Sequence, residues 1–118
     1  IMKLFILITG ILELTVGLAM LVNPKFIPSY KKAGGALITT ARMYGGAAFS
    51  IAIFALLVVS DFENKNFTQS FLLIYFVFHT TVALAVLISF ISKQTREINI
   101  GFIHSLFAVI TLYFLITF

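Results

Sequence analysis

The stretch from residue 66 to residue 92 reads NFTQSFLLIYFVFHTTVALAVLISFIS. None of its 27 residues is Asp, Glu, Lys or Arg. A helix of roughly 20 residues is long enough to cross a bilayer core about 30 Å thick, so this stretch predicts a transmembrane helix. The 21 residues of Ile98–Phe118 also lack these four residue types and predict a second one.

Two further apolar stretches have the required length, and each contains a single charged residue. Leu4–Val22 contains Glu13, and Ala36–Ser60 contains Arg42. A composition of 61% hydrophobic and 10% charged residues is typical of a protein surrounded by lipid. The runs are apolar throughout and do not alternate, which excludes a transmembrane β-barrel. The sequence therefore predicts an all-α protein, an antiparallel bundle of four transmembrane helices forming one domain over residues 1–118, with approximate spans 4–22, 36–60, 68–92 and 98–118.

The positive charges lie in the predicted connections, where they indicate orientation. The connections after the first and third helices carry most of them, and basic loops favour the cytoplasmic side. We expect an integral protein of a bacterial inner membrane with both termini outside the cytoplasm. Because the cations lie beside the membrane, we expect membrane lipids as partners and no nucleic acid. The cations of the two predicted cytoplasmic loops are Lys25, Lys31, Lys32, Lys93 and Arg96; Lys3 and Lys65 lie on the other side.

Four ionisable groups lie within the predicted spans: Glu13, Arg42, His79 and His104. A rise of about 1.5 Å per residue puts Arg42 about 6 Å in height from Glu13, which predicts an ion pair between them. The same estimate separates the two histidines in depth by roughly one helical turn. Bis-histidine ligation of haem needs both rings at similar depth, so we do not expect haem. The absence of cysteine excludes thiolate ligands and iron–sulfur clusters.

The faces of the helices indicate that these groups are turned inward. Small residues let membrane helices approach closely, and residues three and four apart share a helix face. The first helix has Glu13 between two glycines on such a face, and the second and fourth helices have similar stripes. Arg42 borders the stripe of the second helix, and His79 in the third helix has bulkier neighbours. The predicted faces are Gly10, Glu13 and Gly17; Ala41, Gly45, Ala48, Ala52 and Ala55; and Gly101, His104, Ser105, Ala108 and Thr111.

Two families resemble parts of this chain. Residues 11–17, Ile-Leu-Glu-Leu-Thr-Val-Gly, resemble the first helix of the small multidrug resistance transporters, in which the embedded Glu binds substrate and proton. That resemblance implies a proton-coupled transporter using Glu13. A second resemblance covers more of the chain and is to the small four-helix proteins of the DoxX-like superfamily. It is carried by Gly10-x-x-Glu13-x-x-x-Gly17, Asn23-Pro24-Lys25-Phe26, Ala41-Arg42-Met43-Tyr44-Gly45-Gly46 and Phe78-His79.

The DoxX-like resemblance implies a membrane fold and, for some relatives, an accessory role in quinone-linked oxidoreductases. An ionisable residue inside a membrane costs at least about 2.5–3.5 kcal/mol, which makes it a candidate functional residue. The leading hypothesis is a non-enzymatic ligand-binding protein or an accessory subunit of a membrane complex, with a quinone or a lipid as ligand. The alternatives are a proton-coupled transporter and a purely structural subunit, and the chain could form a homodimer or a larger complex. The candidate ligand-binding or proton-relay residues are Glu13, Arg42, Tyr44, His79 and His104.

Overall fold

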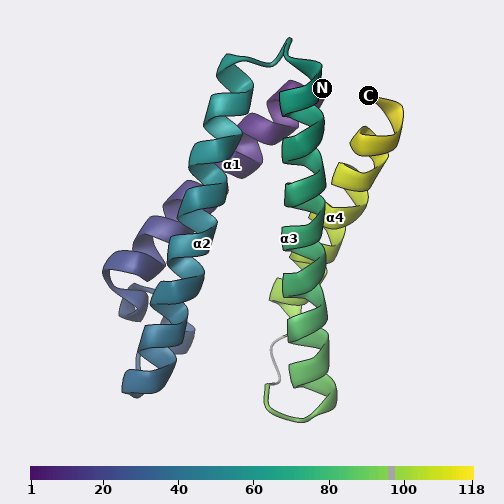
Figure 1. Cartoon of the computed structure of the whole chain (residues 1–118). Coiled ribbons are helices and arrows are strands. Elements are labelled where there is room, and N and C mark those ends of the chain that lie inside the picture. The colour runs from purple at the N-terminus through teal and green to yellow at the C-terminus, as the bar shows by residue number, and fades with distance from the viewer. Residues whose placement is uncertain (96–97) are drawn as a thin grey trace. The chain divides into compact units, whose positions relative to one another are not determined.

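The computed structural model describes residues 1–95 and 98–118, and Arg96 of the predicted basic loop lies outside them. Four long α-helices and two short 3₁₀-helices make up the described part (Figure 1). Each long helix is long and apolar enough to cross a membrane. The predicted all-helical fold with four candidate spans is therefore confirmed. In chain order the elements are α1 (Met2–Val22), η1 (Pro24–Phe26), η2 (Pro28–Tyr30), α2 (Gly35–Ser60), α3 (Lys65–Ile91) and α4 (Asn99–Thr117).

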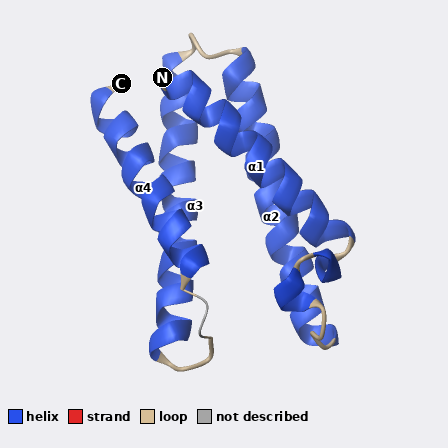
Figure 2. Cartoon of the chain, turned by 180° about the vertical axis from the view of Figure 1, so that it is seen from behind, coloured by secondary structure: helices blue, strands red, loops and turns tan. Residues whose placement is uncertain are grey.

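The chain divides into two compact units, Ile1–Phe62 and Glu63–Phe118. The first contains α1 and α2 with the two 3₁₀-helices between them, and the second contains α3 and α4. In each unit the two long helices run in opposite directions and pack along each other (Figure 1). Figure 2 shows helices and short loops and no strand in the part of the chain that is described. Each unit is thus a helical hairpin, and the arrangement of all four helices as one bundle stays a prediction.

Small residues form much of the buried helix faces, while many large apolar side chains are exposed. Met43, Phe102 and Ile116 are each more than 70% exposed, at 72%, 72% and 76%. Water would disfavour such an apolar surface, whereas lipid is as apolar as the side chains themselves. The distribution of side chains therefore suits a lipid environment. The buried face of α2 shows it most clearly, with Ala41, Gly45, Ala48, Ala52, Ala55 and Val58.

Glycines bring α1 and α2 into backbone contact. A Cβ atom added to Gly17 would lie 2.6 Å from the backbone N of Phe49, and one added to Gly45 would lie 2.7 Å from the backbone N of Leu21. Real Cβ atoms essentially never come this close, so only glycine fits at either position. The predicted small-residue faces of the first two helices are confirmed by the burial of their members.

The ends of α3 are formed by two residues with defined backbone roles. The side chain of Asn64 accepts a hydrogen bond from the backbone N–H of Phe67 (3.2 Å) and caps the helix start. At the other end Lys93 has φ of 59°, the left-handed conformation that commonly terminates helices. The N–H of the next residue, Gln94, donates back to the carbonyl of Ser89 at 2.8 Å. These contacts define where α3 begins and ends, and therefore where the loop to α4 begins.

Candidate functional site: a buried histidine pair

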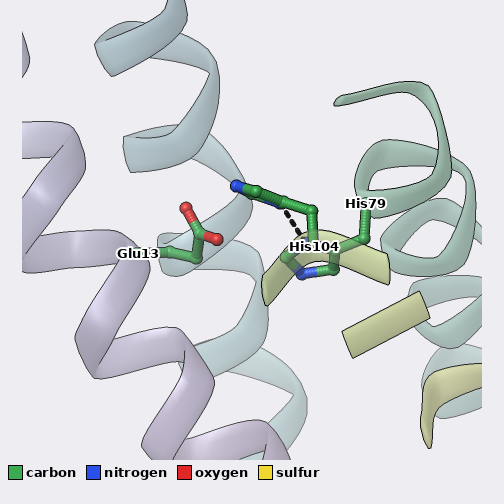
Figure 3. Close-up of side chains that lie close together, drawn as sticks. All are labelled: Glu13, His79 and His104. Atoms are coloured by element: carbon green, nitrogen blue, oxygen red, sulfur yellow. Dashed lines mark hydrogen bonds between the residues drawn. The ribbon is translucent and has the colours of Figure 1, made fainter. Parts of the chain in front are cut away.

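Two histidines from different helices meet in the interior of the second unit. Nδ1 of His79 in α3 lies 2.7 Å from Nδ1 of His104 in α4, and the contact is a hydrogen bond (Figure 3). The two residues are 0% and 6% exposed. The two ring nitrogens meet although the sequence estimate separates the residues in depth by roughly one helical turn. Counting residues along ideal parallel axes ignores the inclination of the helices and the reach of each side chain along the axis.

A glycine on α4 allows the close approach that the pair needs. Gly101 precedes His104 by three residues and lies on the same buried face of α4. A Cβ atom at Gly101 would lie 3.0 Å from Cγ1 of Val86 in α3, tighter than most real contacts. The absence of a side chain at this position therefore lets α4 come near α3 one turn from His104. The predicted inward positions of Gly101, His104, Ala108 and Thr111 are confirmed, whereas Ser105 is exposed.

Aromatic rings surround the His79 imidazole and fix its orientation. The Tyr75 ring lies edge-on at 4.2 Å between centroids, and the rings of Phe78 and Phe107 lie edge-on at 5.2 Å each. Edge-to-face contacts at these separations are favourable. Phe107 is not among the residues predicted for the site, although its position three residues after His104 could have shown that it shares that helix face.

The Nδ1–Nδ1 hydrogen bond constrains the protons on both rings. A charged imidazolium is costly away from water, whereas two neutral rings avoid that cost. A neutral imidazole carries one N–H and one acceptor nitrogen. When one neutral ring donates from Nδ1 to the other, the donating ring has an acceptor Nε2 and the accepting ring has an Nε2–H. The two neutral rings therefore always hold opposite tautomers.

The remaining nitrogen of His79 has no partner in the described chain. Its Nε2 atom is buried and makes no hydrogen bond with any of residues 1–95 or 98–118. Leaving a buried polar atom unpaired costs about 1–3 kcal/mol. Such an atom is a ready hydrogen-bonding position for a molecule that reaches it. Buried polar atoms of the same unit also include the hydroxyl groups of Tyr75 and Thr80.

The first unit contains its own buried ionisable group. Glu13 is 4% exposed and lies on the α1 face between Gly10 and Gly17, the two glycines that contact α2. The half-buried Tyr44 of α2 interacts electrostatically with the Glu13 carboxyl group. Both are candidate site residues, and their joint role stays a prediction.

The predicted ion pair between Glu13 and Arg42 is wrong. Arg42 is exposed, and no ion pair joins it to Glu13, both of which are among the described residues. One position along an α-helix is a rotation of about 100°, which turns Arg42 away from the face on which Ala41 is buried. Glu13 is thus a buried carboxyl group without the arginine that would hold it ionised. Arg42 does not join Glu13 and Tyr44 in the interior of this unit.

A shallow apolar groove of about 420 Å³ lies on the outer side of the first unit. Its only side-chain polar group is the hydroxyl of Thr15, which donates to the carbonyl of Ile11 at 2.9 Å. The groove offers shape and apolar surface and no chemistry comparable with the histidine pair. It is lined by Leu14, Thr15, Leu18, Ala19, Val22 and Phe26.

No known protein family, curated protein or solved structure matches this chain. Its function is therefore inferred from the geometry of the two units. The DoxX-like resemblance remains a prediction from residues such as Arg42, Tyr44 and His79.

Proposed function

We propose that this chain is an integral membrane protein that binds the polar head group of a small amphipathic molecule at the His79–His104 pair. One observation carries the proposal: the buried Nε2 of His79 has no hydrogen-bond partner among the described residues. A ligand oxygen that reaches this atom would remove an unfavourable buried group, and the surrounding aromatic rings would accept an apolar ligand body.

A quinone-like molecule fits this chemistry well. Its ring is planar and apolar and would stack among Tyr75, Phe78 and Phe107, while its oxygen would hydrogen-bond to the imidazole. An isoprenoid or acyl tail would remain in the lipid that we propose surrounds the exposed apolar side chains. The DoxX-like resemblance agrees with such a ligand, and either a simple binding role or an accessory role in a larger membrane complex would follow. We retain the proposed inner-membrane location with both termini outside the cytoplasm.

Binding can be tested with decylubiquinone, a short-tailed quinone, and the protein in lipid nanodiscs. The chain has no tryptophan, and Tyr75 is a neighbour of His79. Quenching of tyrosine fluorescence therefore reports binding. We expect saturable quenching for the wild type and binding weaker by about five- to 150-fold for His79→Phe, because a lost hydrogen bond to a buried group costs about 1–3 kcal/mol. The matched control is Phe102→Leu on the exposed side of α4.

Equal affinity of the wild type and His79→Phe for decylubiquinone would refute the proposed site. Circular dichroism of both variants establishes that the helices are retained. Quenching that rises linearly with quinone concentration in all variants would indicate simple partitioning into the lipid and would also count against the proposal.

A second candidate function rests on Glu13. An ion pair with Arg42 would hold this carboxyl group ionised and oppose proton exchange, and no such ion pair joins these two described residues. A buried carboxyl group that binds either a proton or a cation would suit a proton-coupled transporter. In proteoliposomes with a pH gradient, uptake of tetraphenylphosphonium that is lost in Glu13→Gln would support this function. Uptake that is absent, or equal in both proteins, would exclude this mode of transport.

A further inference from the structure

The hydrogen-bond partner of His79 Nδ1 is Nδ1 of His104, an atom that can either donate or accept a hydrogen bond. A backbone carbonyl or a carboxylate beside Nδ1 would only accept, which would fix the proton of His79 on Nδ1 and leave Nε2 as an acceptor. Nδ1 of His104 accepts in one of its neutral tautomers and donates in the other. The 2.7 Å contact is therefore satisfied in both tautomers of His79.

We propose that the Nε2 atom of His79 is a reversible donor and acceptor position, matched to a head group that exists in both a carbonyl and a hydroxyl form. In one state of the pair, His79 Nε2 accepts a hydrogen bond from a ligand hydroxyl. In the other, His79 Nε2–H donates to a ligand carbonyl. The ligand class is then a quinone and its hydroquinone, bound in turn by the same side chain. This inference rests on the proposed ligand-binding function and makes its substrate class specific.

The conversion between the two states balances without a change in charge. His79 gains a proton at Nε2 from water, and its Nδ1 proton passes along the existing hydrogen bond to Nδ1 of His104. His104 then releases its Nε2 proton to water. Each ring carries one N–H before and after the conversion. The electrons that interconvert the two ligand forms are not exchanged with the histidines.

The surroundings of His79 favour a change of tautomer over a rotation of the ring. Exchanging Nε2 and Nδ1 by rotation would break the 2.7 Å hydrogen bond and move the ring against Tyr75 and Phe107. Moving protons changes the donor pattern and leaves every heavy atom in place. The ring of His79 is 0% exposed, so little space is available for the alternative.

The two histidines are the only ones in the chain, which makes the proposal directly measurable. Protein labelled with ¹⁵N-histidine gives four ring-nitrogen resonances, and their chemical shifts distinguish N–H from acceptor nitrogen. With decylubiquinone we expect an N–H at His79 Nε2, and with its reduced dihydroxy form we expect an acceptor at the same atom. The His104 nitrogens should change in the opposite sense.

A variant with an acceptor-only partner supplies the binding test. The thioether of His104→Met accepts weakly and cannot donate, so His79 should keep its proton on Nδ1. Wild-type protein should bind the oxidised and reduced forms with affinities within about tenfold of each other. His104→Met should bind the reduced form and lose about tenfold or more in affinity for the oxidised form.

Several outcomes would overturn the inference. Binding of only one form by the wild type, or identical ¹⁵N tautomers with both forms, would do so while leaving the proposed ligand-binding function intact. Failure of both forms to bind would refute the proposed function as well. The ¹⁵N measurement needs only the wild type, so it decides the question even if His104→Met does not fold.

Discussion

Two adjacent glycines of α2 provide a matched test of how closely the helices of the first unit approach. An added Cβ at Gly45 would lie 2.7 Å from the backbone N of Leu21 and 2.8 Å from the backbone O of Gly17. At Gly46 the nearest atom would be Cδ1 of Leu21, 3.9 Å away. Gly45→Ala and Gly46→Ala thus make the same chemical change on the same helix, and only the first meets a neighbouring backbone.

The magnitude follows from the geometry. Ordinary contact begins at 3.4 Å, so an alanine at position 45 requires the two helices to separate locally by about 0.7 Å. A gap of about 0.5–1 Å already removes a quarter to a half of each dispersion contact. Overpacking of this kind costs about 1–3 kcal/mol, and alanine in place of glycine regains about 1 kcal/mol in helix propensity. We expect Gly45→Ala to be destabilising by about 1 kcal/mol and Gly46→Ala to be stabilising by about 1 kcal/mol.

The free energy of unfolding of each variant can be measured in mixed micelles by titration with sodium dodecyl sulfate, with helix content followed by circular dichroism. A difference of about 2 kcal/mol between the variants corresponds to roughly thirtyfold in the unfolding equilibrium. Equal stability of Gly45→Ala and Gly46→Ala would refute the backbone contact between α1 and α2. Equal stabilisation of both would show that helix propensity alone decides these positions.

Three further predictions concern the second unit and use the same unfolding measurement. His79→Phe and His104→Leu should each be destabilising by about 1–3 kcal/mol, because each breaks the buried hydrogen bond between the rings. The double variant should cost clearly less stability than the sum of the two single variants. An additive result would show that the two residues are not coupled. Lys93→Gly should be more stable than Lys93→Ala by about 1 kcal/mol, because φ is 59° at this position and glycine adopts this left-handed conformation more readily than alanine. Both changes remove the lysine charge, so the charge does not affect the comparison. A less stable Lys93→Gly would contradict the left-handed helix end. Asn64→Ala should lose about 1 kcal/mol with the cap of α3, and an unchanged stability would mean that the capping hydrogen bond contributes nothing.

The double variant at the histidine pair also addresses the purely structural alternative. If the pair only fixes the packing of α3 against α4, replacing both rings by apolar side chains should leave a stable protein with unchanged binding of decylubiquinone. If the pair is the binding site, stability is largely retained and binding is lost. Stability and binding therefore separate the two roles.

Much of the fold could be predicted because the lipid requirement leaves a strong signal in the sequence. Uncharged runs such as residues 66–92 are long, and a backbone inside lipid must form helices to satisfy its polar groups. Helix ends were predicted to within three residues. The largest difference is at the start of α3, which begins at Lys65 and not at the predicted residue 68, because its capping residue Asn64 precedes the apolar run. The small-residue faces were also predictable, since the period of a helix places Gly10, Glu13 and Gly17 together.

The site was less predictable because it depends on which side chains meet across helices. Periodicity indicates the face on which a residue lies and says little about its height relative to another helix. The predicted ion pair between Glu13 and Arg42 is wrong because Arg42 lies one position away from the buried face of α2. Its long side chain does not form an ion pair with Glu13. The contact between His79 and His104 was not predicted, because an estimated offset of one turn does not show whether the two side chains meet.

If the chain inserts into a membrane as we propose, each hairpin would be a natural unit of insertion during synthesis. In each unit the packing partners are consecutive helices, so all contacts of α1 with α2 are available once residue 62 has left the ribosome. A segment carrying Glu13 is costly to leave alone in lipid, and a hairpin can cover the face on which it lies as soon as α2 follows. In the proposed membrane protein, the turn at Asp61–Asn64 would separate two hairpins that insert in succession, each completed by a pair of neighbouring helices.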